Sequence, residues 1–227
     1  MPDNISCNIK KDGFIAILFL IFLEFYNRQG RMWYNGTRKL KEKRGKVMGE
    51  HVERINRELK YKGKILEIYA DTMRNPDGKT TTWDFVHHNG AAAVVPVTEK
   101  GTILMVEQYR PALGRYTLEI PAGALDEPDE PGIVCAKREL EEETGFRSED
   151  IEWLITVHTT VAFCDEKIPI FVARNLIPSK QHLDEDEFID VRECTVEELK
   201  QQIFAGKIED SKTISAILAF DAKYNRA

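Results

Sequence analysis

The stretch that decides the fold runs from Glu119 to Phe146 and reads EIPAGALDEPDEPGIVCAKRELEEETGF. Pro131 suits the first position of a helix, because its missing N–H would have no partner there. Gly145 can adopt the left-handed conformation that often ends a helix. The sequence therefore predicts a helix of about four turns between Pro131 and Gly145.

This predicted helix carries acidic side chains on one face and apolar side chains on another. At about 100° per residue, Glu139, Glu142 and Glu143 share one arc of the helix. Glu139 and Glu143 are four residues apart, and like charges at that spacing destabilise a helix unless a cation compensates them. Oxygen ligands suit a hard ion, so the pattern predicts a site for Mg²⁺, with Mn²⁺ as the second choice. For an isolated run of glutamates, a solvated face is the alternative.

The residues around this helix resemble the signature of the Nudix hydrolases. That signature is a glycine, a glutamate, and then Arg-Glu-apolar-x-Glu-Glu-x-Gly-apolar. It is matched here by Gly123, Glu130, Arg138, Glu139, Leu140, Glu142, Glu143, Gly145 and Phe146. The family usually leaves five residues between the glycine and the first glutamate, whereas this chain has six, and we place the extra residue in the turn before the helix.

The resemblance implies a fold and a chemistry. The implied fold is α/β, a mixed sheet between helices in a Nudix-type α/β/α sandwich, preceded by a small antiparallel β subdomain. The implied metal ligands are the carbonyl of Ala122 and the carboxylates of Glu139, Glu142, Glu143 and Glu166. The implied catalytic residues are Arg138, Glu142 and Glu166. Substitution at phosphorus by water depends on positioning and charge neutralisation, so a nucleophilic Ser or Cys is not needed.

Three other segments are similar to the ADP-ribose pyrophosphatase branch of that family. They are residues 107–112 leading into 118–123, residues 82–86, and residues 163–166. The substrate-binding residues that this resemblance implies are Arg110, Trp83, Asp84, Glu119 and Glu130. The planar fork of Arg110 suits a phosphate or an adenine edge, although an ion pair at the end of a strand is the alternative.

In this branch an aromatic residue and an acid on the strand before the core contact adenine, and Trp83 and Asp84 match them. Packing in the core is the alternative for Trp83. Glu166 matches a loop glutamate that binds metal or activates water as general base. Val161-Ala162 stands where the family commonly has Pro-Gly, so the turn differs here, and a solvated loop acid is the alternative for Glu166.

The pattern along the chain predicts strands at 64–70 and 80–87, joined by the turn sequence Asn75-Pro76-Asp77-Gly78. A second hairpin is predicted from 91–97 and 103–108, and a third pair of strands from 151–161 and 168–173. Thr195 fits a capping box that opens a helix to Phe204, and Ser211 is the predicted cap of a last helix that reaches Tyr224.

The domain organisation predicted from the sequence has three parts. Residues 48–90 form the N-terminal β subdomain, and residues 91–227 form the Nudix domain. Residues 1–47 lie outside the resemblance, and we interpret them as a non-domain extension translated upstream of a true start at Met48. The apolar run Phe14–Leu23 is too short to span a bilayer, which takes about 20 residues. A signal peptide or membrane anchor is the alternative for it.

Composition and charge exclude several classes of function. The chain has a net charge of −6, which argues against binding to the phosphate backbone of a nucleic acid. Its four cysteines show no metal-binding or disulfide spacing, so a cytoplasmic protein is expected.

The function predicted on these grounds is Mg²⁺-dependent hydrolysis of ADP-ribose to AMP and ribose 5-phosphate. The resemblance implies a homodimer that exchanges N-terminal strands between its subunits. One alternative is hydrolysis of another nucleoside diphosphate derivative, such as a nucleotide sugar or a dinucleotide. A second alternative is a nucleotide-binding sensor without turnover on the same fold.

Overall fold

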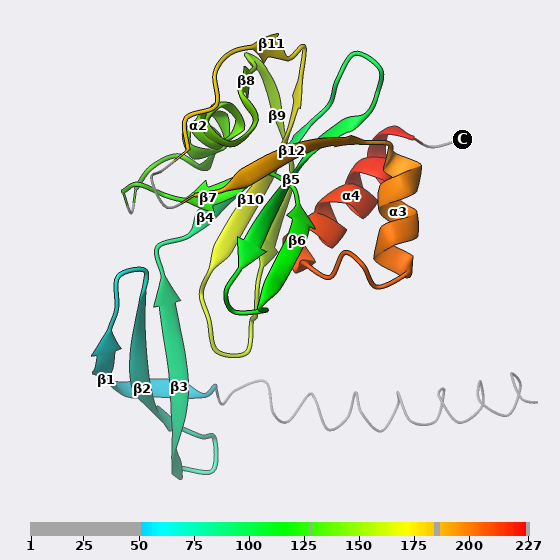
Figure 1. The fold of residues 1–227 in the computed structure, drawn as a ribbon. Helices are drawn as coiled ribbons and strands as arrows, with labels where there is room; N and C mark the ends of the chain where they lie inside the picture. The colour runs from blue at the N-terminus through cyan, green and yellow to red at the C-terminus, as the bar shows by residue number, and fades with distance from the viewer. Residues whose placement is uncertain (1–50, 128, 184–186, 226–227) are drawn as a thin grey trace, which may run out of the picture. The chain divides into compact units, whose positions relative to one another are not determined.

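The computed structural model describes residues 51–127, 129–183 and 187–225, so the predictions for residues 1–47 and for Met48 lie outside it. Within these ranges, fifteen elements follow one another, and Figure 1 labels them. The strands are β1 (Glu53–Lys62), β2 (Leu66–Arg74), β3 (Thr80–His88), β4 (Ala91–Pro96), β5 (Ile103–Arg110), β6 (Arg115–Glu119), β7 (Ala122–Ala124), β8 (Phe146–Arg147), β9 (Asp150–His158), β10 (Lys167–Arg174), β11 (Ile177–Pro178) and β12 (Ile189–Cys194). The helices are α2 (Gly132–Thr144), α3 (Val196–Phe204) and α4 (Ser211–Tyr224).

The chain divides into two compact units, and of the smaller one the structure describes residues 51–53 and 74–80. Here Asn75 and Gly78 close the predicted turn, with the Gly78 N–H donating to the Asn75 carbonyl at 2.9 Å. Gly78 has a φ of 81°, which a residue with a side chain rarely adopts. Arg74 and Glu53 form an ion pair of 3.1 Å in the same unit.

The larger unit comprises residues 54–73 and the chain from 81 onward, and its central sheet has the order β7-β4-β10-β9. β4 and β10 run parallel, while the other two pairs are antiparallel. Alternate side chains of β4 face opposite ways: Ala91, Ala93 and Val95 pack in the cluster that includes side chains of α3 and α4. Ala92 and Val94 pack with α2. Helices therefore cover both faces of the sheet, which confirms the predicted mixed α/β fold.

The predicted second hairpin is wrong. The chain does reverse at residues 98–102, where the Thr98 N–H donates to the Thr102 carbonyl at 2.9 Å, and a single bridge joins Val97 to Ile103. Beyond that bridge the strands separate, because β4 joins the central sheet while β5 pairs with β6 and β12. β4 and the first half of β5 are wholly apolar, and such a pattern indicates burial but does not identify the partner strand.

Helix boundaries follow the predictions to within one residue. Pro131 is the N-cap of α2, with extended backbone angles, rather than its first helical residue, and Gly145 ends the helix with a φ of 70° as predicted. Thr195 and Glu198 form the predicted capping box of α3. α4 is capped by Asp210, whose carboxylate accepts from the Thr213 N–H at 3.0 Å, and not by Ser211.

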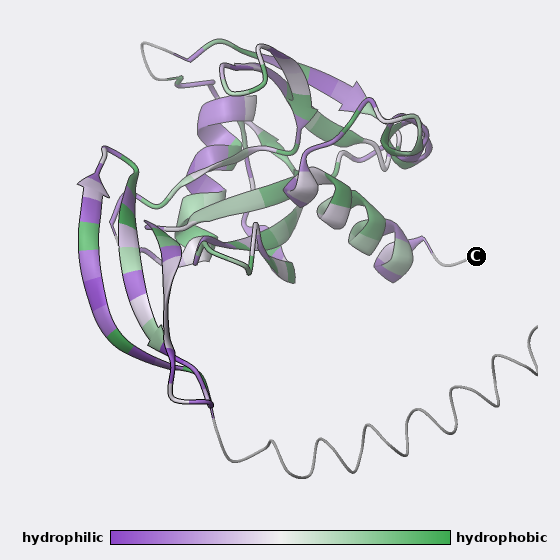
Figure 2. Cartoon of the chain, turned by 90° about the horizontal axis from the view of Figure 1, so that it is seen from below, coloured by the Kyte–Doolittle hydropathy of each residue, from purple (hydrophilic) through white to green (hydrophobic). Residues whose placement is uncertain are grey.

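Residues before the central sheet form a three-stranded sheet of order β1-β2-β3. The sequence did not predict β1, because its charged residues interrupt the alternation that marks a half-buried strand. Figure 2 shows hydrophilic and hydrophobic residues interspersed along these strands. Arg57 of β1 links them: it binds both carboxylate oxygens of Asp71 on β2 at 2.6 Å and lies 3.8 Å from the centre of the Phe85 ring on β3.

Among the described residues, none of the helices has both the length and the apolar character needed to cross a bilayer.

Candidate active site

A cavity of about 260 Å³ opens where several elements of the larger unit meet. Its lining comes from the ends of β3 and β5, from β4, β7 and β10, from the loop between β9 and β10, and from the start of α4. The polar side chains on it are both acidic and basic, and they include His88, Arg110, Glu166, Asp210 and Lys212. The cavity therefore presents cations and carboxylates to the same space.

Two glutamates of α2 contact residues of β7 that line the cavity, although neither is part of the lining itself. Glu143 is 4% exposed, and its carboxylate accepts a hydrogen bond of 2.9 Å from the backbone N–H of Ala122, which lines the cavity. Burial and the neighbouring charge of Glu139 raise the pKa of Glu143 to about 8. Glu139 is 7% exposed, and burial raises its pKa to about 7, although Arg138 acts against the shift.

Gly123 explains how a carboxylate of α2 comes so close to β7. A Cβ atom at this position would overlap the carboxylate of Glu139. The glycine of the motif is therefore needed because it leaves space for a glutamate, in a backbone conformation that other residues can also adopt.

Arg138 connects the glutamates of the motif. Its Nη1 donates to Glu139 Oε1 at 2.7 Å and to Glu142 Oε2 at 3.1 Å, and its Nη2 donates to the carbonyl of Ala124 at 3.0 Å. Glu130 lies 3.5 Å from the same Nη2 and also accepts from the Asp126 N–H at 2.8 Å. The structure thus places Glu130 in the turn before α2, outside the cavity lining, where it contacts the arginine of the motif.

The donor set around Glu139 and Glu143 fits a divalent cation. Within the described ranges, no three His, Cys, Asp or Glu side chains converge closely enough to hold a metal ion. The two carboxylates are nevertheless buried together, and Arg138 compensates only part of their charge, since both pKa values stay raised. A hard cation with oxygen ligands would supply the missing positive charge. Glu142, which is half-exposed, and Glu166, on the cavity wall, are the further acids within the predicted set.

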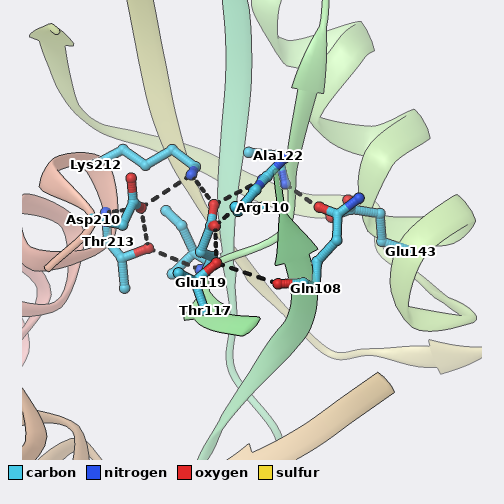
Figure 3. A network of polar contacts seen from close by, with 10 residues as sticks. Gln108, Arg110, Thr117, Glu119, Ala122, Glu143, Asp210, Lys212 and Thr213 are labelled. Atoms are coloured by element: carbon cyan, nitrogen blue, oxygen red, sulfur yellow. Dashed lines mark hydrogen bonds and ion pairs between the residues drawn. The ribbon is translucent and has the colours of Figure 1, made fainter. Parts of the chain in front are cut away.

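Glu119 lies at the centre of a polar network that includes Arg110 and Lys212 of the cavity lining (Figure 3). It is 3% exposed and accepts from Arg110 Nε and Nη2, both at 2.8 Å, and from the Thr117 hydroxyl at 2.6 Å. Lys212 donates to Glu119 and, at 3.0 Å, to Asp210. Burial acts to raise the pKa of Glu119, but these cations and the hydroxyl outweigh it and lower the pKa to about 2.

In this network Arg110 and Glu119 form an ion pair. An ion pair at the end of a strand was the alternative to substrate binding that the sequence left open for Arg110. Arg110 still lines the cavity, whereas the carboxylate of Glu119 is directed at its two cations. Lys212 and Asp210 were missed, because their only local signal is the start of a helix, far along the chain from the motif.

Trp83 and Asp84 lie on β3 and are absent from the cavity lining. Trp83 is 49% exposed, so it does not pack in the core of this chain. Glu166, by contrast, lies on the cavity wall, and its Oε1 is 3.5 Å from His88 Nδ1. The structure thus brings Arg110, Ala122 and Glu166 together at the cavity.

An acidic helix beside a cavity with two cationic side chains is the arrangement expected of a protein that handles phosphate groups. A family model described as the NUDIX domain matches residues 87–216, and the chain belongs to this family. The resemblance of the motif to the Nudix hydrolases is confirmed.

Similar proteins support the same assignment. The chain is 41% identical over 175 residues to a methanol dehydrogenase activator of Bacillus methanolicus, covering 76% of this chain and 93% of that protein. It is 39% identical over 165 residues to an ADP-ribose pyrophosphatase of Bacillus subtilis (strain 168), covering 72% and 89%. A crystal structure titled ADP compounds hydrolase has the same fold, with a TM-score of 0.67 at 19% identity over 75% of this chain and 92% of that one.

Proposed function

We propose that this chain hydrolyses the diphosphate bond of ADP-ribose to AMP and ribose 5-phosphate, with Mg²⁺ as the divalent ion and Mn²⁺ as a substitute. The observation that carries the reaction type is the burial of Glu139 and Glu143 beside a cavity that Arg110, Lys212 and Glu166 line. Similarity to proteins named ADP-ribose pyrophosphatase supports the choice of substrate.

In the proposed reaction, the oxygen of a water molecule forms a bond to one phosphorus atom of the diphosphate, and the bond from that phosphorus to the bridging oxygen breaks. The water gives its proton to the carboxylate of Glu166, and the bridging oxygen leaves with the other phosphate. When bound, the divalent ion supplies positive charge against the diphosphate. Bond breaking and bond making then need no covalent intermediate with the protein.

The residues of the chain position the substrate and the carboxylates. Arg138 holds Glu139 and Glu142, and the Ala122 N–H holds Glu143. Arg110 donates from Nε and Nη2 to Glu119, and these two bonds fix its guanidinium at the edge of the cavity. In this position the guanidinium binds phosphate oxygens of the substrate. In this proposal Glu119 acts through Arg110, and Glu130 acts through Arg138, rather than by touching the substrate.

We propose that Trp83 and Asp84 bind the adenine of the substrate. The protein is proposed to be a homodimer that exchanges its N-terminal strands, and to be cytoplasmic. Exposure of Trp83 in the single chain supports a role outside its own core. Stacking on an adenine is worth about 1–3 kcal/mol, so Trp83→Ala is expected to raise KM for ADP-ribose by about 5- to 150-fold. The domains proposed are residues 48–90 for the exchanged strands and 91–227 for the hydrolase domain.

The experiment is product analysis with ADP-ribose, Mg²⁺ and the purified chain, with Glu143→Gln as the inactive variant. Glu141→Gln is the matched control, because Glu141 lies on the same helix but outside the predicted metal set. Reaction in H₂¹⁸O locates the attacked phosphorus, since the label enters only one of the two products. AMP and ribose 5-phosphate in equal amounts are expected.

A panel of nucleotide sugars and dinucleotides, ranked by kcat/KM, tests the other nucleoside diphosphate derivatives as substrates. A higher kcat/KM for one of them would replace ADP-ribose in the proposal. Tight binding of ADP-ribose without AMP release in Mg²⁺ would favour the sensor.

A further inference from the structure

The loop of residues 159–166, between β9 and β10, carries Glu166 to the cavity but has few apolar contacts of its own. Val161 is 87% exposed and Phe163 is half-exposed. Within the loop, the Cys164 N–H donates to the Thr160 carbonyl at 3.2 Å, and the Thr159 N–H donates to the Glu166 carbonyl at 3.4 Å. Because its apolar side chains are largely in solvent, the position of this loop depends on polar contacts with another element.

That element is the end of β3. The Val86 N–H donates to the Phe163 carbonyl at 2.7 Å, and the Asp165 N–H donates to the Val86 carbonyl at 3.2 Å. These two bonds flank a parallel bridge between Val86 and Cys164. The loop is therefore joined to β3 through its backbone, directly before Glu166.

The side chain of Asp165 adds two contacts at the same place. Its Oδ1 accepts from the backbone N–H of His88 at 2.9 Å, and its Oδ2 lies 2.7 Å from His87 Nδ1. Both oxygens of one carboxylate thus bind successive residues of β3. Glu166, the next residue, lies on the cavity wall with His88.

We propose that Asp165 is a positioning residue, which fixes the loop to β3 through His87 and His88 and thereby holds the carboxylate of Glu166 at the cavity. The inference rests on the proposed function, in which Glu166 accepts the proton of the attacking water. It also accounts for Val161-Ala162 in this loop, because a loop without Pro-Gly keeps its position through contacts to β3.

A positional role makes a distinct prediction for two substitutions at the same site. Asp165→Ala removes both side-chain contacts and is expected to lower kcat by about 10- to 100-fold, since a displacement of about 1 Å can cost 10²-fold, while KM changes less than about threefold. Asp165→Asn is expected to keep most of kcat, because its amide can accept from the His88 N–H and donate to His87 Nδ1.

The matched control is Asp150→Ala at the far end of the same strand pair, where an exposed aspartate accepts from Asn175 Nδ2 at 2.8 Å. This variant is expected to leave kcat and KM unchanged. Hydrogen exchange supplies a readout that does not depend on turnover. Amides of residues 159–166 are expected to exchange faster in Asp165→Ala, with no change in α2 or β4, and at the wild-type rate in Asp165→Asn.

The outcomes separate this inference from the proposed function. A normal kcat in Glu166→Gln would show that Glu166 is not the general base, and the positioning role of Asp165 would then fail as well. If Glu166→Gln is inactive while Asp165→Ala keeps its kcat, only the positioning role is overturned. Equal loss in Asp165→Asn and Asp165→Ala also overturns it, because charge rather than position would then matter. Should Asp165→Ala fail to fold, His87→Ala removes one of the two side-chain contacts, and an unchanged kcat with unchanged exchange of residues 159–166 there would overturn the part of the role that runs through His87.

Discussion

Arg110 and Glu119 bind each other through two parallel hydrogen bonds, Nε to Oε1 and Nη2 to Oε2, both of 2.8 Å. The carboxylate is buried, whereas the guanidinium reaches the cavity. Lys212 adds a second cation to the same carboxylate. A single buried anion therefore holds two positive charges at the wall where phosphate is proposed to bind.

This arrangement predicts that Glu119→Gln removes a pH-dependent part of the stability. The pKa of Glu119 falls from its usual 4.5 to about 2 on folding. The stabilisation is thus complete above pH 4.5 and is lost as the pH falls from 4.5 to 2, with a span of up to about 3 kcal/mol. Urea unfolding of both proteins between pH 2 and 7 measures it. Parallel stability curves for the two proteins would contradict the assignment.

Glu143→Gln is expected to have opposite effects on activity and stability. Loss of the metal carboxylate should lower kcat by orders of magnitude. The pKa of about 8 means that the folded state favours the neutral acid, so the charged form costs stability progressively as the pH rises from 4.5 to 8. In EDTA, Glu143→Gln should therefore unfold at a higher temperature than wild type at pH 9 and at a similar one near pH 5. A destabilised variant at pH 9 would contradict this account of the buried charge.

Mg²⁺ is expected to stabilise the folded protein through the same carboxylates. A ligand that binds only the folded state at 100 times its Kd adds about 2.7 kcal/mol to the free energy of unfolding. Thermal unfolding in MgCl₂ should show a rise in Tm for wild type and for Glu141→Gln. Glu139→Gln and Glu143→Gln should show much less. NaCl at equal ionic strength is the control for screening, and equal shifts in all four proteins would refute specific binding.

Gly123→Ala tests the close approach of β7 and α2. The added methyl group overlaps the Glu139 carboxylate, and overpacking of this kind typically costs about 1–3 kcal/mol. Activity should fall with stability. Combining it with Glu139→Ala removes the overlap, so stability should return while activity stays absent. Urea unfolding of the single and double variants gives the coupling energy, and strict additivity would mean that the two residues do not meet.

Local signals were the parts of the fold that the sequence predicted well. Gly145 ends α2 because its φ of 70° suits glycine, and Thr195 opens α3 because its hydroxyl and Glu198 satisfy each other's backbone N–H groups. Each of these depends on residues within one turn. β1 was missed and the partner of β4 was predicted wrongly, because strand pairing joins residues far apart in sequence.

The candidate site divides in the same way. The carboxylates of α2 were predicted from their spacing on one helix, and the structure places Glu139 and Glu143 together beside β7. Lys212 was not predicted, since its role depends on α4 reaching Glu119 of β6. Asp165 was seen only as part of a loop motif, because its partners His87 and His88 belong to a strand much earlier in the chain.

The docking of α4 also sets an order of events during synthesis. Glu119 leaves the ribosome well before Lys212 does. A nascent chain that has already formed β5 and β6 can therefore pair this carboxylate with Arg110, but not yet with Lys212. The second cation arrives with the helix that begins at Ser211. Completion of this charged wall of the cavity therefore waits for Lys212, 93 residues after Glu119 in the chain.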